Sequence, residues 1–143
     1  MIVAEKALDV LRVCLLGLLF AFGLAACSAD TPVAEADYPA KLVGEWIGTV
    51  GDTKESMKFN ADKTFEAWVR PTGFISNTLG QGVTGTIRGT WTIAGRVVTL
   101  NVDSATYERV VNRVTTSTIE SFKTNELVVK SGIGTVTTFT RAL

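Results

Sequence analysis

The chain lacks histidine altogether and has only two cysteines among its 143 residues. Without histidine, zinc and copper sites lose their usual nitrogen ligand, and Ser-His or Cys-His nucleophiles are excluded. The chain also has no net excess of charge of either sign, because 14 basic residues balance 14 acidic ones. Because basic residues are not in excess, the composition does not indicate nucleic acid as a partner. The sequence predicts no metal centre, no cofactor and no nucleic-acid binding.

A single long hydrophobic run stands near the N-terminus, VCLLGLLFAFGLAAC, and it stops at Leu24-Ala25-Ala26 directly before Cys27. A membrane-spanning helix needs roughly 20 apolar residues, and this run is shorter. An apolar stretch of this length that ends in small residues is typical of a cleaved export signal. An uncleaved helix and a signal with an incidental cysteine remain the alternatives.

The motif Leu-Ala-Ala-Cys resembles the lipobox of bacterial lipoproteins. That resemblance implies a signal peptide over residues 1–26, cleavage before Cys27, and acylation of this cysteine by chains such as palmitate. It also implies a lipid-anchored protein of the bacterial cell envelope. Ser28 rather than Asp follows the cysteine, which by resemblance to enterobacterial sorting implies the outer membrane, facing the periplasm.

The segment that follows, residues 27–41, has the composition of a flexible tether. Residues 28–41 contain two prolines, four alanines and three acids, with few large apolar side chains. Fully extended, they would reach about 45–50 Å, so the globular part is expected to stand clear of the membrane. Because Cys14 leaves with the signal and Cys27 takes the lipid, no disulfide is expected in the mature chain.

Residues 42–143 show the alternation of β-strands with one buried face. In residues 86–93, for example, Ile87, Trp91 and Ile93 alternate with threonines and an arginine. About eight such segments follow one another through short turns, which predicts an all-β, antiparallel, up-and-down barrel. We expect the strands at about 42–50, 55–59, 64–70, 84–93, 96–102, 110–121, 126–131 and 135–141.

The start and the end of this domain carry a second resemblance. Gly44-Glu45-Trp46 is similar to the Gly-x-Trp of lipocalins and the wider calycin superfamily, and Arg141 stands near the end of the last strand. The resemblance implies a lipocalin-like barrel in which Trp46 plugs the closed end and Arg141 lies across its ring. The chain is shorter than full lipocalins and lacks their additional helix, so a ligand cavity does not follow.

Binding residues are expected inside the barrel and around one long connection. Bulky residues predicted to point inward, Trp91 among them, favour a filled or nearly filled interior. The Gly-rich connection at residues 71–85 is either a lid, a partner-binding surface or a loop that packs against the rim. Trp68 points outward by alternation. The candidate ligand- or partner-binding residues are Trp68, Phe74, Ile75, Leu79, Val83 and Trp91.

No pattern in the chain predicts catalysis. Residues 80–85 match G-x-G-x-x-G, but a strand pattern follows where a dinucleotide site requires a helix. The acidic residues are expected at turns and on outward faces. We therefore expect a non-enzymatic envelope lipoprotein that binds a small apolar ligand or an envelope protein. The alternatives are a purely structural module and a protease inhibitor that would insert residues 30–39 into a protease.

Overall fold

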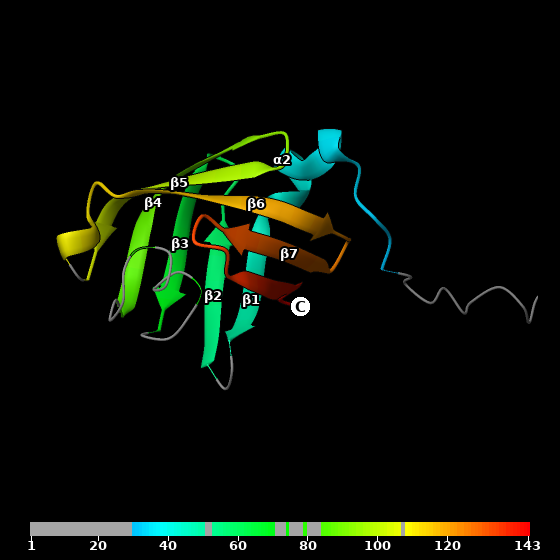
Figure 1. Cartoon of the computed structure of the whole chain (residues 1–143). Coiled ribbons are helices and arrows are strands. Elements are labelled where there is room, and N and C mark those ends of the chain that lie inside the picture. Colours follow the sequence, from blue (N-terminus) through cyan, green and yellow to red (C-terminus); the bar gives the residue numbers. More distant parts are fainter. Residues whose placement is uncertain (1–29, 51–52, 71–73, 75–78, 80–83, 107) are drawn as a thin grey trace, which may run out of the picture.

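The protein folds as a closed barrel of eight antiparallel strands that follow one another in chain order (Figure 1). The structure is a computed structural model that describes residues 30–50, 53–70, 74, 79, 84–106 and 108–143. The prediction of an all-β, up-and-down barrel is confirmed. The strands are β1 (Gly44–Val50), β2 (Thr53–Phe59), β3 (Thr64–Val69), β4 (Gly85–Ala94), β5 (Val97–Ala105), β6 (Val114–Phe122), β7 (Glu126–Ser131) and β8 (Val136–Arg141).

The barrel closes between its first and last strands. β1 pairs with β8 so that Trp46 lies opposite Arg141 and Gly48 opposite Phe139. The predicted alternation sets which side chains point inward: in β3, Phe65, Ala67 and Val69 are buried, and the residues between them face outward. Full closure leaves none of the eight strands with an unpaired edge, which removes a surface prone to aggregation.

The sixth strand starts later than the sequence predicts. A 3₁₀ turn, η2 (Glu108–Val110), occupies the place where the strand was expected to begin. Asn112 follows with a left-handed φ of 65°, which a strand does not accommodate. β6 therefore begins at Val114. Among the described residues, no helix is long and apolar enough to cross a membrane.

The largest difference from expectation lies before β1. A 3₁₀ turn, η1 (Glu35–Asp37), leads into the short helix α2 (Tyr38–Leu42), where a tether and the start of a strand were predicted. Pro39 stands in the first turn of α2, where proline needs no amide hydrogen. Tyr38 and Leu42 are buried in the barrel core, and the Tyr38 ring lies 5.0 Å from that of Phe122.

Residues 30–33 extend this contact along the turn between β6 and β7, and we call them the N-terminal strap. The Val33 amide donates a hydrogen bond to the Phe122 carbonyl oxygen over 2.9 Å, and Pro32 forms a β-bridge with Lys123. The prediction of a flexible tether is therefore corrected for residues 30–41, which pack against one end of the barrel. We call this the capped end.

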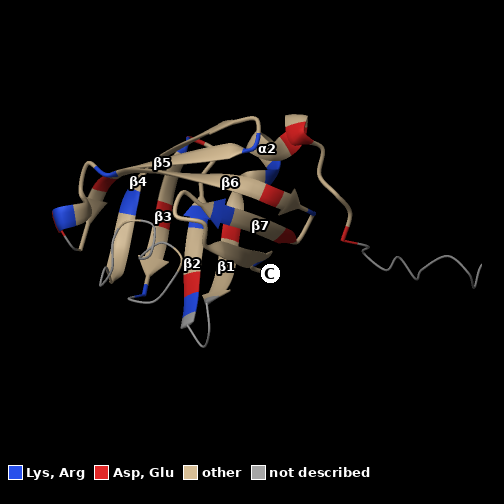
Figure 2. Ribbon diagram, viewed as in Figure 1, with Lys and Arg blue, Asp and Glu red and all other residues tan. Residues whose placement is uncertain are grey.

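One continuous hydrophobic core fills the barrel. It includes both fully buried tryptophans, Trp46 and Trp91, and four phenylalanines from the strands. Polar and charged side chains cover the outside, and Figure 2 shows basic and acidic residues interspersed over the visible strands. The stability of the domain therefore rests on apolar burial, and residues 30–143 contain no cysteine that could add a disulfide.

Candidate functional site

Trp46 is the central side chain of the capped end. It is fully buried, and its indole Nε1 donates a hydrogen bond of 2.9 Å to the carbonyl oxygen of Leu42 in α2. Its ring meets Phe122 edge-on, with 5.6 Å between the ring centres. On the other side the structure brings Arg141 to Trp46, with the guanidinium carbon 4.3 Å from the centre of the indole. The tryptophan is thus held by a cation–π contact and by the hydrogen bond of its indole nitrogen.

The Arg141 guanidinium also ties the capped end together through three backbone carbonyls. It donates hydrogen bonds to the oxygens of Thr124 at 3.1 Å, Val43 at 3.1 Å and Lys41 at 2.5 Å. Gly44 makes room for this arrangement, because a Cβ there would lie 2.5 Å from an arginine nitrogen. Its φ of 135° also disfavours any residue with a side chain. The Gly-x-Trp motif and the final arginine therefore form one structural unit.

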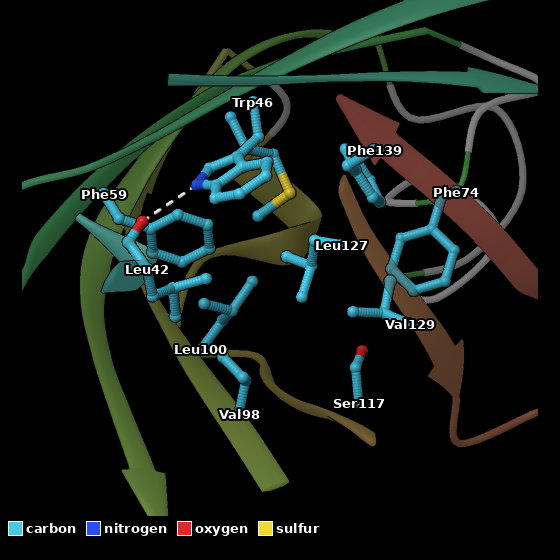
Figure 3. A pocket seen from close by; sticks show the side chains of 11 residues that line it. Leu42, Trp46, Phe59, Phe74, Val98, Leu100, Ser117, Leu127, Val129 and Phe139 are labelled. Carbon is cyan, nitrogen blue, oxygen red and sulfur yellow. Dashed lines mark hydrogen bonds between the residues drawn. The ribbon is translucent and has the colours of Figure 1, made fainter. Parts of the chain in front are cut away.

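The interior below Trp46 contains a small cavity lined by described residues (Figure 3). Its volume is about 30 Å³, which is enough for one or two water molecules. Sites for drug-sized ligands measure roughly 300–1,000 Å³, so no acyl chain fits as the side chains stand. The wall is apolar apart from Ser117 and consists of Leu42, Trp46, Met57, Phe59, Phe74, Val98, Leu100, Leu127, Val129 and Phe139.

Phe74 and Leu79 belong to this interior rather than to an exposed surface. Each is 3% exposed, and the Phe74 ring packs edge-on against Phe139 with 5.7 Å between the ring centres. Of the three arrangements expected for this connection, packing against the barrel is the one that these two residues show, and an exposed partner-binding surface at these two positions is corrected. Because strand alternation does not extend into this connection, the sequence could not show which way they point. The other two candidates in the connection, Ile75 and Val83, lie outside the described residues.

Trp91 is fully buried but does not line the cavity, so its predicted role as a ligand contact is corrected as well. Its indole Nε1 donates to the carbonyl oxygen of Asn60 at 3.2 Å, and Lys63 places its ammonium 3.9 Å above the ring centre. Phe59 meets the ring edge-on at 5.5 Å. These contacts fix the turn between β2 and β3 against β4, which is a structural role.

Trp68 is the one accessible side chain among the candidates that the structure describes. It lies on the outer face of β3, as alternation predicts, and 48% of its surface is exposed. The guanidinium carbon of Arg70 lies 5.6 Å from the centre of its ring. A half-exposed tryptophan beside an arginine combines two of the three residue types that are enriched at the energetic centres of protein interfaces.

Glu55 is a functional candidate that sequence reasoning placed wrongly. It was expected on an outward face, but it lies on the inner face of β2, in line with Met57 and Phe59, and only 2% of it is exposed. Its carboxylate accepts a hydrogen bond from the backbone amide of Arg70 at 3.3 Å. Counting alternation back from Phe59 through Met57 would have placed it inside the barrel.

The other acidic side chains that the structure describes are exposed, apart from Glu126, which is half-buried. Glu66 is exposed and pairs with Arg88 at 2.8 Å. Asp62 accepts hydrogen bonds from the Thr64 hydroxyl at 2.6 Å and from the Thr64 amide at 2.9 Å, which hold the pKa of its carboxyl below the usual value. Across the described ranges, no group of three or more acidic or cysteine side chains is placed to hold a metal ion.

Comparison with known proteins supports the fold and leaves the activity open. No family model matches the chain, and no curated protein matches it. Among solved structures, the chain is similar to a protein of unknown function from Bacteroides uniformis, studied by NMR, which is 25% identical in sequence. The similarity covers 80% of this chain and 96% of the other, with a TM-score of 0.51. The chain thus shares its small eight-stranded barrel with a bacterial protein.

Proposed function

We propose that this chain is a lipid-anchored, non-enzymatic lipoprotein of the bacterial cell envelope whose barrel acts on an envelope protein through its outer surface. The apolar run that ends at Leu24-Ala25-Ala26-Cys27 supports the anchor. The filled interior supports action through the outside, because the cavity of about 30 Å³ leaves no space for a ligand of useful size.

Trp68 is the contact residue that this proposal favours. Its indole is large, half-exposed and rigidly placed by β3, between Ser56 of β2 and Thr86 of β4. Tryptophan gives a large contact area at a low cost in side-chain entropy. Among the described candidates, it is the one that a protein partner could reach without any rearrangement of the barrel.

A small apolar ligand inside the barrel is the second candidate. The cavity wall is apolar apart from Ser117, and Phe74 occupies the space that an acyl chain would otherwise take. Such a ligand would have to displace the Phe74 ring from Phe139. That displacement costs buried apolar surface, which disfavours this candidate relative to a partner at the outer face.

The protease-inhibitor alternative is weakened by the N-terminal contacts. Residues 30–39 would have to enter a protease, yet Val33 is hydrogen-bonded to Phe122 and Tyr38 is buried. The segment would first have to leave the barrel and expose the Tyr38 side chain.

Native mass spectrometry of residues 28–143 after incubation with palmitate tests the choice between outside and inside. We expect the mass of the free protein, whereas a stoichiometric adduct that denaturation removes would favour the internal ligand. A photo-crosslinking residue at position 68 of the full-length protein in cells tests the partner. We expect a discrete crosslinked protein there and none from position 97, where Val97 is 40% exposed on β5. Equal crosslinking at both positions would contradict the assignment of Trp68.

A further inference from the structure

We infer that the barrel is held with its capped end directly on the membrane surface, and that the opposite end points away from the bilayer. This inference rests on the proposed acylation of Cys27. It replaces the expectation that a long tether lets the domain stand clear of the membrane.

The N-terminal strap is fixed to the barrel by several independent contacts. Asp30 accepts a hydrogen bond of 2.8 Å from the backbone amide of Asn125. Thr31 accepts one of 2.9 Å from the amide of Thr124, and the two threonine hydroxyls lie 3.0 Å apart. Together with the hydrogen bond from the Val33 amide to Phe122, these contacts make residues 30–33 a fixed part of the domain rather than a flexible linker.

The free length of chain between the lipid and the strap is very short. Asp30 follows Cys27 after only two intervening residues, Ser28 and Ala29. Three steps between neighbouring Cα atoms span at most about 11 Å. A diacylated Cys27 must lie at the membrane interface, so Asp30 and the turn that holds it are confined to this distance from the interface.

η1, α2 and two turns between strands share the capped end with the strap. The turn at residues 123–125 binds it directly, and η1 and α2 lie beside the turn between β4 and β5, where Glu35, Pro39 and Gly95 line one shallow depression. Figure 1 shows α2 at this end, while β3 runs away from it. All of these elements are therefore expected to face the lipid headgroups.

The charge of the capped end does not select an anionic surface. Exposed Lys41 and Lys63 stand near exposed Glu35, Asp37 and Asp62, and Figure 2 shows both signs around η1 and α2. Electrostatic attraction to acidic lipids is worth about 1 kcal/mol per basic residue, and the acids offset it here. The orientation thus comes from the covalent attachment, and we expect it to be insensitive to salt and to the content of anionic lipid.

The opposite end is displaced from the membrane by the length of the barrel. Strands of seven residues that tilt by 35–45° separate the two ends by roughly 20 Å. Ile133, which is 68% exposed in the turn between β7 and β8, lies at this far end. Trp68 stands near the end of β3, on the same side, where a membrane-anchored barrel would present it to a partner.

Fluorescence quenching in vesicles tests the orientation. The acylated mature protein, which begins at Cys27, is reconstituted into phosphatidylcholine vesicles that contain a headgroup-attached quencher. Ala94→Cys and Ile133→Cys variants carry a thiol-reactive dye at the capped end and the far end, and acylation of Cys27 leaves no other free thiol. We expect quenching several-fold stronger at position 94 than at 133, unchanged by high salt or by added phosphatidylglycerol.

An insertion and one matched pair of variants separate attachment by the strap from attachment by the lipid alone. A Gly-Ser insertion of 20 residues after Ser28 has a root-mean-square span of about 25 Å, and we expect it to abolish the difference between the two dyes. Val33→Pro removes the amide bonded to Phe122 and should reduce the difference. Ala34→Pro should preserve it, because Ala34 already has a φ of −69° that suits proline.

Three results would overturn the inference. Equal quenching at both positions in vesicle-bound protein would show that the barrel tumbles, and the proposed lipoprotein function would stand. A difference that persists with the Gly-Ser insertion would show that the barrel surface, rather than the strap, determines the orientation. Failure of the protein to bind vesicles, with an unmodified mass at Cys27, would overturn the lipid anchor and the orientation together.

Discussion

The two ends of the barrel are closed by different means. At the capped end, Trp46 and Arg141 are held by directional hydrogen bonds to backbone carbonyls, and a cation–π contact joins them. At the other end, Phe74 and Leu79 close the interior through apolar contact. Directional bonds to the backbone hold one arrangement, whereas apolar contacts tolerate replacement by another apolar group of similar volume. Substitutions at the capped end are therefore expected to destabilise the fold, whereas side chains that fill the interior at the far end can be replaced more readily.

Removing Trp46 should have the largest effect. Trp46→Ala leaves a cavity in the core, removes the hydrogen bond to the Leu42 carbonyl and ends the cation–π contact with Arg141, so we expect a loss of about 5 kcal/mol in the free energy of unfolding. Urea denaturation of residues 28–143 measures it. Trp68→Ala, on the outer face, should change stability by less than about 0.5 kcal/mol. Similar losses for both would contradict the role given to Trp46.

Phe74→Ala sharpens the comparison at the far end. We expect a smaller loss of about 3 kcal/mol, because one buried ring is removed while the closed strands stay in place. The enlarged cavity should gain a property that the native protein lacks. Apolar cavities of about 150 Å³ stay dry and bind benzene, so the variant should bind benzene in an NMR titration and the native protein should not. A variant with native stability would show that Phe74 does not fill the interior.

Arg141→Ala tests the polar half of the capped end. Loss of the cation–π contact and of hydrogen bonds to three carbonyls should cost about 2 kcal/mol in unfolding free energy. Arg113→Ala is the matched control, because Arg113 is exposed and both of its described hydrogen bonds, with Val110 and Val102, are made by the backbone, which the substitution retains. A loss no greater than that of the control would leave Trp46 to hold the capped end without Arg141.

The smallest effect concerns acid stability at the turn between β2 and β3. The hydrogen bonds from Thr64 hold the pKa of Asp62 below 3.8 in the folded protein. Since the folded pKa is depressed, the stability that this carboxylate contributes is present above its unfolded pKa and is lost as pH falls through the folded one. NMR titration of the Asp62 carboxyl should show the low pKa, and Thr64→Val should return it towards 3.8. An unchanged pKa in this variant would refute the assigned cause.

Much of the barrel could be predicted from the sequence because its signals are local. Alternation in β3 and β4 identifies the inward faces, and Gly44, Trp46 and Arg141 mark the first and last strands by type and position. The placement of Trp91 inside the core follows from the same alternation. Its polar partners do not, because Asn60 lies 31 residues away and meets it only in the folded sheet.

The parts that the sequence did not predict depend on contacts with distant elements. Residues 30–41 have the alanines, prolines and acids of a linker, and Tyr38 finds its buried position only because Phe122 lies beside it in the barrel. Phe74 stands in a connection without strand alternation, so nothing local shows that it points inward. In both cases composition describes the segment correctly, and the tertiary contact decides its structure.

The three tryptophans allow one direct measurement of the central claim, that the barrel is filled and acts from outside. The indole N–H signal of Trp46 reports the cavity wall, and that of Trp68 reports the outer face. The indole N–H signal of Trp91 reports the turn between β2 and β3. They are followed by ¹H–¹⁵N NMR of residues 28–143 during titration with palmitate. The account predicts that the Trp46 signal does not move. A saturable shift of Trp46, with Trp68 unchanged, would show a ligand inside the barrel and contradict it.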